Sequence, residues 1–184
     1  MITLYELWPP VLVSAALVVS MSYVLHRVLN YHLKDYDRLA NEDEVIEALE
    51  RLEVPPGNYP MPLPTTRREM MSPAFMAKRE RGPIWLNVMK PFSLPKVLVE
   101  WFAYAVMVGI FTAYLTAQAL DAGAEPGEVA QFAGMTAFVG HSLALWQRSI
   151  WYQTKWSRTL RSTFDGLVYG VLTGLTFAWL WPAA

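Results

Sequence analysis

Four long apolar stretches alternate along the chain with segments that hold nearly all of the charged residues. Each stretch is close to or above the roughly 20 helical residues needed to cross a hydrocarbon layer of about 30 Å. They cover residues 7–29, 97–120, 129–152 and 164–181. Pro9 and Pro10 lie in the first turn of the first stretch, where a missing amide donor costs nothing. This pattern predicts an all-α integral membrane bundle of four transmembrane helices.

The segment between the first two stretches predicts a long, partly helical cytoplasmic loop. Asn41 followed by Glu44 resembles a helix N-cap with its reciprocal glutamate, so a short helix is expected from there to about residue 53. Prolines then impose an extended path, a second short helix is expected near 73–81, and residues 84–92 should lie on the membrane surface. We therefore divide the chain into the first transmembrane helix (1–29), a cytoplasmic loop with short amphipathic helices (30–96) and transmembrane helices two to four (97–184). The loop either caps the helix ends or docks a partner.

The distribution of charge predicts how the bundle is oriented. All 15 basic residues lie between 27 and 96 or between 148 and 161, which are the two segments expected on one side of the membrane. The opposite side carries only acidic residues, namely Glu6, Asp121, Glu125 and Glu128. Because basic loops stay in the cytoplasm, the chain is expected to have both termini outside (N-out, C-out).

Composition excludes several kinds of chemistry. The chain has no cysteine, which rules out disulfides, a thiol nucleophile and a thiolate metal site. A net charge of −1 gives no case for binding nucleic acid. The sequence also lacks HExxH, GxSxG and phosphate-loop motifs, so we predict no catalytic residue and no metal site, and an enzyme is the less favoured interpretation.

Four ionisable residues, one from each apolar stretch, are expected at a similar depth near the cytoplasmic interface. They are His26, Glu100, Arg148 and Asp165, and Arg148 is expected to pair with Glu100 or Asp165. Charged groups inside a membrane are costly, so such a group is a functional hypothesis by default. This predicted polar cluster is either a structural clamp between helices or part of a proton or ion path.

His141 lies near the middle of the third stretch and is the candidate for a buried relay or ligand contact. It shares one helical face with Gly134 and Ala137, small residues that let a neighbouring helix approach. A hydrogen bond to that helix is one interpretation. Contact with a quinone, a pigment or haem b is another, although His26 lies at the wrong depth to be a second haem ligand.

The fourth stretch carries a GxxxGxxxG ridge made of Gly166, Gly170 and Gly174. Such ridges pack helices closely, and Gly134 offers a similar small surface on the third stretch. The ridge is expected to contact either the second stretch, through residues such as Ala105, or a different protein.

Several segments resemble a family of small bacterial four-helix inner-membrane proteins with no known activity. The resemblance rests on residues 41–49, 55–59, 145–152, 162–167 and 179–182. It implies a location in the bacterial inner (cytoplasmic) membrane, and it carries over no functional residue.

These observations favour a non-catalytic accessory or scaffold subunit of a larger bacterial membrane protein complex, such as an energy-transducing one. Its partners would be membrane lipid and other membrane protein subunits. The alternative is a small proton- or ion-coupled transporter that uses the predicted polar cluster.

The predicted orientation is testable by labelling introduced cysteines, because the chain has none of its own. Asp121→Cys in the acidic turn should react with a membrane-impermeant maleimide in intact cells. Glu50→Cys in the loop should react only after permeabilisation. Labelling of the turn from inside the cell, or recovery of the chain in a detergent-free soluble fraction, would contradict the prediction.

Overall fold

The computed structural model describes residues 2–184, and the chain is mostly helical. It divides into two compact units. The helical unit consists of Met1–Asp37 together with Leu94–Ala184, and the loop unit consists of Arg38–Ser93. Residues 30–37 were assigned to the loop in the sequence analysis, but they belong to the helical unit because their side chains bind α8.

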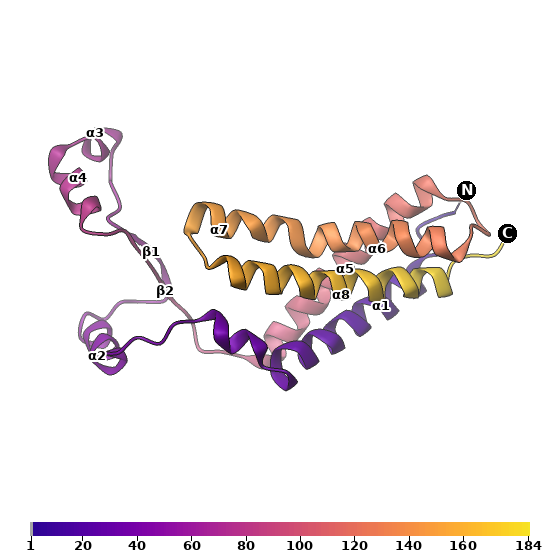
Figure 1. Cartoon of the computed structure of the whole chain (residues 1–184), viewed down its shortest axis with the longest axis horizontal. Coiled ribbons are helices and arrows are strands. Elements are labelled where there is room, and N and C mark those ends of the chain that lie inside the picture. Colours follow the sequence, from indigo (N-terminus) through magenta and orange to yellow (C-terminus); the bar gives the residue numbers. More distant parts are fainter. Residues whose placement is uncertain (1) are drawn as a thin grey trace. The chain divides into compact units, whose positions relative to one another are not determined.

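The helical unit is built from long helices that pack side by side (Figure 1). Helix α1 packs against α5 and α8, and α6 packs against α8 and α5. The elements in chain order are α1 (Trp8–Tyr23), the π-helix η1 (Val24–Val28), the 3-10 helix η2 (Tyr31–Asp35), α5 (Leu94–Ala119), α6 (Pro126–Ser142), the 3-10 turn η3 (Leu143–Leu145), α7 (Trp146–Tyr152) and α8 (Trp156–Trp179).

The two termini lie at one end of the helical unit, beside the turn between α5 and α6 (Figure 1). The amide of Gly123 in this turn donates to the carbonyl of Pro182 at 2.9 Å, and the indole of Trp181 donates to the carbonyl of Asp121 at 3.0 Å. Leu7 and Phe177 are fully buried in an apolar cluster that also includes Val129 at the start of α6. The C-terminus and the acidic turn are therefore close together.

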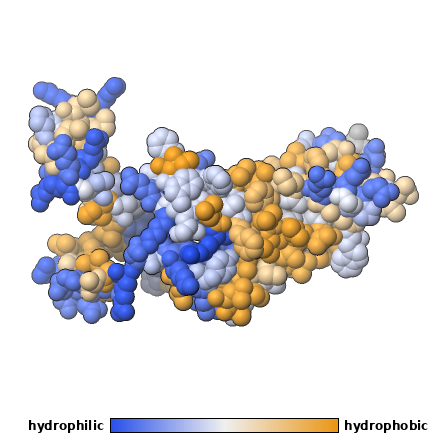
Figure 2. Space-filling model, in the orientation of Figure 1, coloured by the Kyte–Doolittle hydropathy of each residue, from blue (hydrophilic) through white to orange (hydrophobic). Residues whose placement is uncertain are grey.

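Besides an apolar core that includes Leu7 and Phe177, the helical unit buries several hydroxyl side chains, while many large apolar side chains are exposed. Ser14, Thr112, Thr116 and Ser142 are among its most buried residues. Large apolar residues are exposed along the same helices, and Figure 2 shows them gathered over the middle of the unit. Two helical stretches, Trp8–Val28 and Leu94–Ala119, are long and apolar enough to span a membrane. Within the most apolar 18 residues of each stretch, only 33% and 28% are buried, respectively. A soluble bundle buries its apolar stripe instead.

Glycines bring α6 and α8 into backbone contact. A Cβ atom added to Gly170 would lie 2.8 Å from the carbonyl oxygen of Gly134, and one added to Gly134 would lie 3.1 Å from the carbonyl oxygen of Gly170. Gly174 faces the backbone of α6 in the same way, whereas Gly166 faces the side chain of Ser142. The ridge thus packs on the third apolar stretch and not on Ala105 of the second, because the complementary small residue is Gly134.

The third apolar stretch is interrupted, in contrast to the single helix expected over residues 129–152. The α-helix α6 gives way to the 3-10 turn η3 before α7 begins. A 3-10 turn winds about 120° per residue against about 100° in an α-helix, so three residues rotate the following face by about 60°. Ala137 and His141 are buried, but Arg148, which would share their face on a continuous α-helix because it follows His141 by seven residues, is exposed.

The loop unit contains a two-stranded sheet, which corrects the all-α prediction. Strand β1 (Gly57–Met61) pairs antiparallel with β2 (Ile84–Val88), with Tyr59 opposite Leu86. The prolines do impose the extended path that we expected, but the extended chain pairs with the segment predicted to lie on the membrane surface. The unit also contains α2 (Glu42–Arg51), α3 (Arg67–Met70) and α4 (Pro73–Glu80).

Local caps, more than a core, order the loop unit. The side chain of Thr66 accepts from the amide of Glu69, and that of Ser72 accepts from the amide of Phe75. Asn41 instead donates to the carboxylate of Glu44 and makes no cap bond to the backbone. Phe75 is the one buried apolar side chain described between residues 38 and 93, so this unit has little of a hydrophobic core.

Packing at the glycine contact predicts a sharp difference between two substitutions. Gly170→Ala should lower the free energy of unfolding by about 1–3 kcal/mol, because the new methyl group meets backbone that cannot move aside. Gly127→Ala in α6 has open space around its Cβ and should be neutral or slightly stabilising. Thermal or denaturant unfolding in detergent measures both, and equal losses would contradict the packing.

Candidate functional site

Two histidines and an aspartate meet where the end of α1 returns to α8. We call His26, His32 and Asp165 the His–Asp cluster. The Nε2 atom of His32 lies 2.8 Å from Oδ2 of Asp165, and that of His26 lies 3.7 Å from the same oxygen. One donor atom from each of the three residues lies within 4.8 Å of the others. A single carboxylate oxygen of Asp165 therefore faces both imidazole rings.

A local distortion of the first helix brings the two histidines together. Six residues advance an α-helix by about 240°, so His26 and His32 would point to different sides of a continuous helix. Instead, the amide of Leu29 bonds to the carbonyl of Val24, a π-type bond of 3.0 Å, and Asn30 adopts a left-handed conformation (φ 51°). Asparagine tolerates this conformation better than most residues. The chain reverses, and the rings stack with centroids 4.3 Å apart.

His32 bridges two buried carboxylates. Its Nδ1 atom lies 2.7 Å from Asp35, while Nε2 faces Asp165. With a proton on each ring nitrogen, His32 donates to both. Arg161 of α8 donates to the second oxygen of Asp35, whose side chain is 1% exposed. Burial alone would raise the pKa of Asp35, but the hydrogen bonds and charges of His32 and Arg161 outweigh it and hold this pKa below its usual value.

Three basic residues on the first turns of α8 bind the segment that follows α1. Lys155, Arg158 and Arg161 are spaced three apart, so they lie along one side of the helix start. Lys155 contacts Asp37 at 2.5 Å, and the guanidinium of Arg158 lies 4.8 Å from the ring centroid of Tyr36. These contacts hold residues 31–37 against the start of α8, and so they connect the end of the first long helix to the last one.

One oxygen in this region has no partner. Asp165 has a side chain that is 4% exposed, and its Oδ1 atom is buried without a hydrogen bond in the described structure. An ionised oxygen in that position lacks the compensation that burial demands. The two imidazoles face the other oxygen, Oδ2, and together with this carboxylate they form a set of donor atoms able to hold a metal ion. The sequence pattern predicts no metal site, because the spacing of the two histidines does not reveal the π-turn that places both rings together.

Two members of the predicted polar cluster lie elsewhere. Glu100 is largely exposed and lies 3.7 Å from Lys96 on its own helix. Arg148 is exposed and pairs with neither Glu100 nor Asp165 among residues 2–184. The expectation that Arg148 would neutralise one of these acids is wrong, since η3 turns it away from the bundle. Of the four residues, the structure brings together His26 and Asp165, whose Nε2 and Oδ2 atoms lie 3.7 Å apart.

His141 is buried among aromatic rings. The centroids of Tyr169, Tyr104 and Trp101 lie 5.4, 5.6 and 6.1 Å from that of His141. Its Nδ1 atom is buried and has no hydrogen-bond partner among the described residues. The interhelical hydrogen bond expected for His141 is therefore not made through this nitrogen, and packing against rings takes its place.

Sequence reasoning missed His32, Asp35 and Arg161, because residues 30–37 were assigned to the loop. The spacing His32-x-x-Asp35 and the regular run of bases at 155, 158 and 161 were the available signals. Each is weak alone, since neither spacing says which helix the segment returns to.

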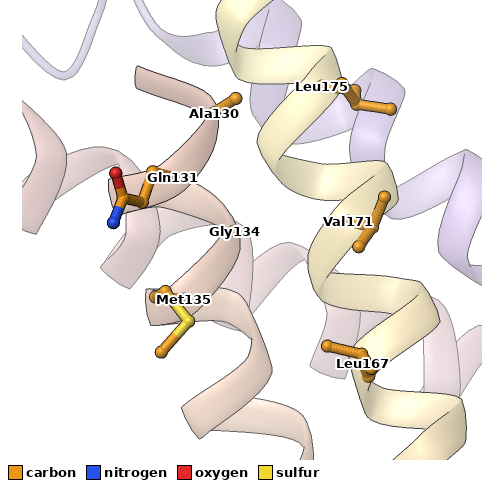
Figure 3. A pocket seen from close by; sticks show the side chains of 7 residues that line it. All are labelled: Ala130, Gln131, Gly134, Met135, Leu167, Val171 and Leu175. Carbon is orange, nitrogen blue, oxygen red and sulfur yellow. The ribbon is translucent and has the colours of Figure 1, made fainter. Parts of the chain in front are cut away.

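An apolar groove of about 300 Å³ runs beside the glycine contact on the outer surface of α6 and α8 (Figure 3). Leu167, Val171 and Leu175 line it from α8, while α6 contributes Met135 and the groove's one polar side chain, Gln131. None of the lining residues is titratable. This groove offers apolar contact and no chemistry, in contrast to the His–Asp cluster.

Comparisons with protein-family models, with curated proteins and with solved structures give no match.

The ion pairs along α8 predict unequal costs for removing two of its bases. Arg161→Gln leaves the buried Asp35 with His32 as its remaining side-chain partner and should lower the free energy of unfolding by about 2–3 kcal/mol. Lys155→Gln removes an exposed pair and should cost less than about 1 kcal/mol. Urea unfolding in detergent compares the two variants, and a matching loss in Lys155→Gln would argue against the buried pair as the stronger contact.

Proposed function

We propose that the chain is a non-catalytic accessory or scaffold subunit of a larger protein complex in the bacterial inner membrane. In this proposal its four apolar stretches span the bilayer with both termini outside and the loop unit in the cytoplasm. The observation that carries it is the large number of exposed apolar side chains along the long helices of the helical unit, next to an interior that also holds buried hydroxyl groups. Lipid or the apolar surface of a neighbouring subunit suits such an exterior.

The distribution of charge along the helical unit supports this orientation. The terminal end carries acids only, at Glu6, Asp121, Glu125 and Glu128. The basic residues of α8 that bind residues 31–37 lie at the other end, on the side of the His–Asp cluster. A bilayer placed between the two ends would leave the bases in the cytoplasm, in agreement with the positive-inside rule.

The loop unit supports a role in binding protein rather than in catalysis. It buries one large apolar residue, Phe75, and exposes several others. Leu63, Met71 and Ile84 are all more than half exposed. Exposed apolar side chains on a charged surface are typical of protein contact sites.

The arrangement of polar groups favours a scaffold over a transporter. A carrier needs polar groups that follow one another through the membrane. Here the His–Asp cluster lies at one end of the helices, while Glu100 and Arg148 are exposed and apart from it. The buried hydroxyls of Ser14 and Thr116 bond to carbonyls of their own helices.

Purification from native membranes in a mild detergent tests the proposal. A chain tagged at one terminus should bring down at least one other membrane protein in a fixed molar ratio, measured by quantitative mass spectrometry. A double variant, Leu63→Asp with Met71→Asp, should lose at least one companion if the loop unit provides the contact. Glu47→Gln, on exposed and already polar surface, is the matched control and should keep every companion.

A single species without a companion in fixed ratio, at full yield and correct fold, would contradict the scaffold role. If Glu47→Gln also lost the co-purifying membrane proteins, the loss in the double variant could not be assigned to Leu63 and Met71 of the loop unit.

A further inference from the structure

We infer that His26, His32 and Asp165 form a binding site for one divalent transition-metal ion, with Zn²⁺ the best match. This site goes beyond the proposed scaffold role and can be tested without any partner protein. The residues come from η1, η2 and α8, so an ion held by all three would join the end of the first helix to the last one.

The spacing of the donor atoms fits a small cation. A tetrahedral Zn²⁺ ion with bonds of about 2.0–2.1 Å separates its ligand atoms by about 3.3 Å. The Oδ2 atom of Asp165 lies 2.8 Å from Nε2 of His32 and 3.7 Å from Nε2 of His26. One distance is slightly shorter and the other slightly longer than the separation expected between two zinc ligands. Because no pair among the three donors exceeds 4.8 Å, side-chain rotations alone would close the ligand set.

The surroundings of His32 match the outer shell of a metal site. Metal-binding histidines nearly always donate the second ring nitrogen to a carboxylate or carbonyl, which fixes the ring and its tautomer. Asp35 accepts in this way from Nδ1 at 2.7 Å, leaving Nε2 for an ion. Arg161 in turn holds Asp35 through its other oxygen. The chain therefore orients His32 through two successive buried contacts.

The orphaned Oδ1 atom of Asp165 is a second, independent indication. A carboxylate that is only 4% exposed normally accepts hydrogen bonds through both oxygens. The Oδ1 atom of Asp165 accepts none from the described side chains or backbone. A cation beside the carboxylate would compensate the charge that the protein leaves unmatched. The surroundings of His26, whose side chain is 45% exposed, leave a path for the ion and room for a water molecule as the fourth ligand.

The kind of donor selects the kind of ion. Mg²⁺ and Ca²⁺ prefer a full shell of oxygen atoms, whereas imidazole suits Zn²⁺, Fe²⁺, Ni²⁺ and Cu²⁺. Two imidazoles with one carboxylate and no thiolate therefore select a transition metal. The helix distortion that assembles the set has the same implication, since single π-turns are frequent at functional sites.

Titration of the purified, chelator-treated full chain with Zn²⁺ in detergent tests the site, with calorimetry as the readout. We expect one Zn²⁺ per chain, and little heat with Mg²⁺ at the same concentration. His26→Ala is the decisive variant, because this half-exposed side chain makes no close hydrogen bond and its loss should leave the fold intact. Its affinity for Zn²⁺ should fall on the order of 100-fold or more, at least as much as removing an outer-shell partner.

His141→Gln is the matched control, since it removes the remaining histidine and lies outside the cluster. It should bind Zn²⁺ like the wild type. Asp35→Asn, which perturbs the outer shell, should weaken binding about 10- to 100-fold. Co²⁺ in place of Zn²⁺ should give the visible absorption of a tetrahedral nitrogen and oxygen site in the wild type and lose it in His26→Ala.

The outcomes separate a metal site from a purely structural clamp. Equal Zn²⁺ affinity in folded His26→Ala and wild type, or no stoichiometric binding to the wild type, would overturn the inference. A loss of binding in His141→Gln equal to that in His26→Ala would do the same. Since the isolated chain is titrated, failure here leaves the co-purification result of the scaffold proposal untouched.

Discussion

The close approach of α6 and α8 is the constraint on which the helical unit depends. Gly134 and Gly170 meet backbone to backbone, and any side chain at either position would push the helices apart. The contact fixes where Asp165 lies, because it is five residues before Gly170 on the same helix. Several large apolar residues of both helices, such as Met135, Val171 and Leu175, remain exposed beside this contact.

The polar contacts at the other end of α8 act on a different scale. The glycine contact is stabilised by many weak dispersion interactions between closely packed atoms. His32, Asp35 and Arg161 are instead joined by a few strong and directional hydrogen bonds in a buried region. The first sets the distance between helices, and the second sets which residue faces which. The proposed metal ion would take its place in the second group, because its donors are already held by it.

Sequence patterns predicted the long helices well and the site only in part. The apolar stretches located α1, α5 and α8 because hydropathy over 20 residues averages out local irregularities. Two short irregular elements decided the rest: η3 rotated Arg148 out of the bundle, and η1 carried His26 toward His32. Pairing of β1 with β2 was equally hidden, since strand partners are chosen by chain folding over the 22 residues between Met61 and Ile84.

The bond between His32 and Asp165 closes a separation of 133 residues along the chain. A ribosome adding roughly 5–20 residues per second needs about 7 to 27 seconds to make that much polypeptide. During this interval the first helix is complete, while the aspartate that will hold its histidines does not yet exist. His26 and His32 therefore have no Asp165 to bind during this interval, and this corner of the protein can reach its final arrangement only after α8 has been synthesised.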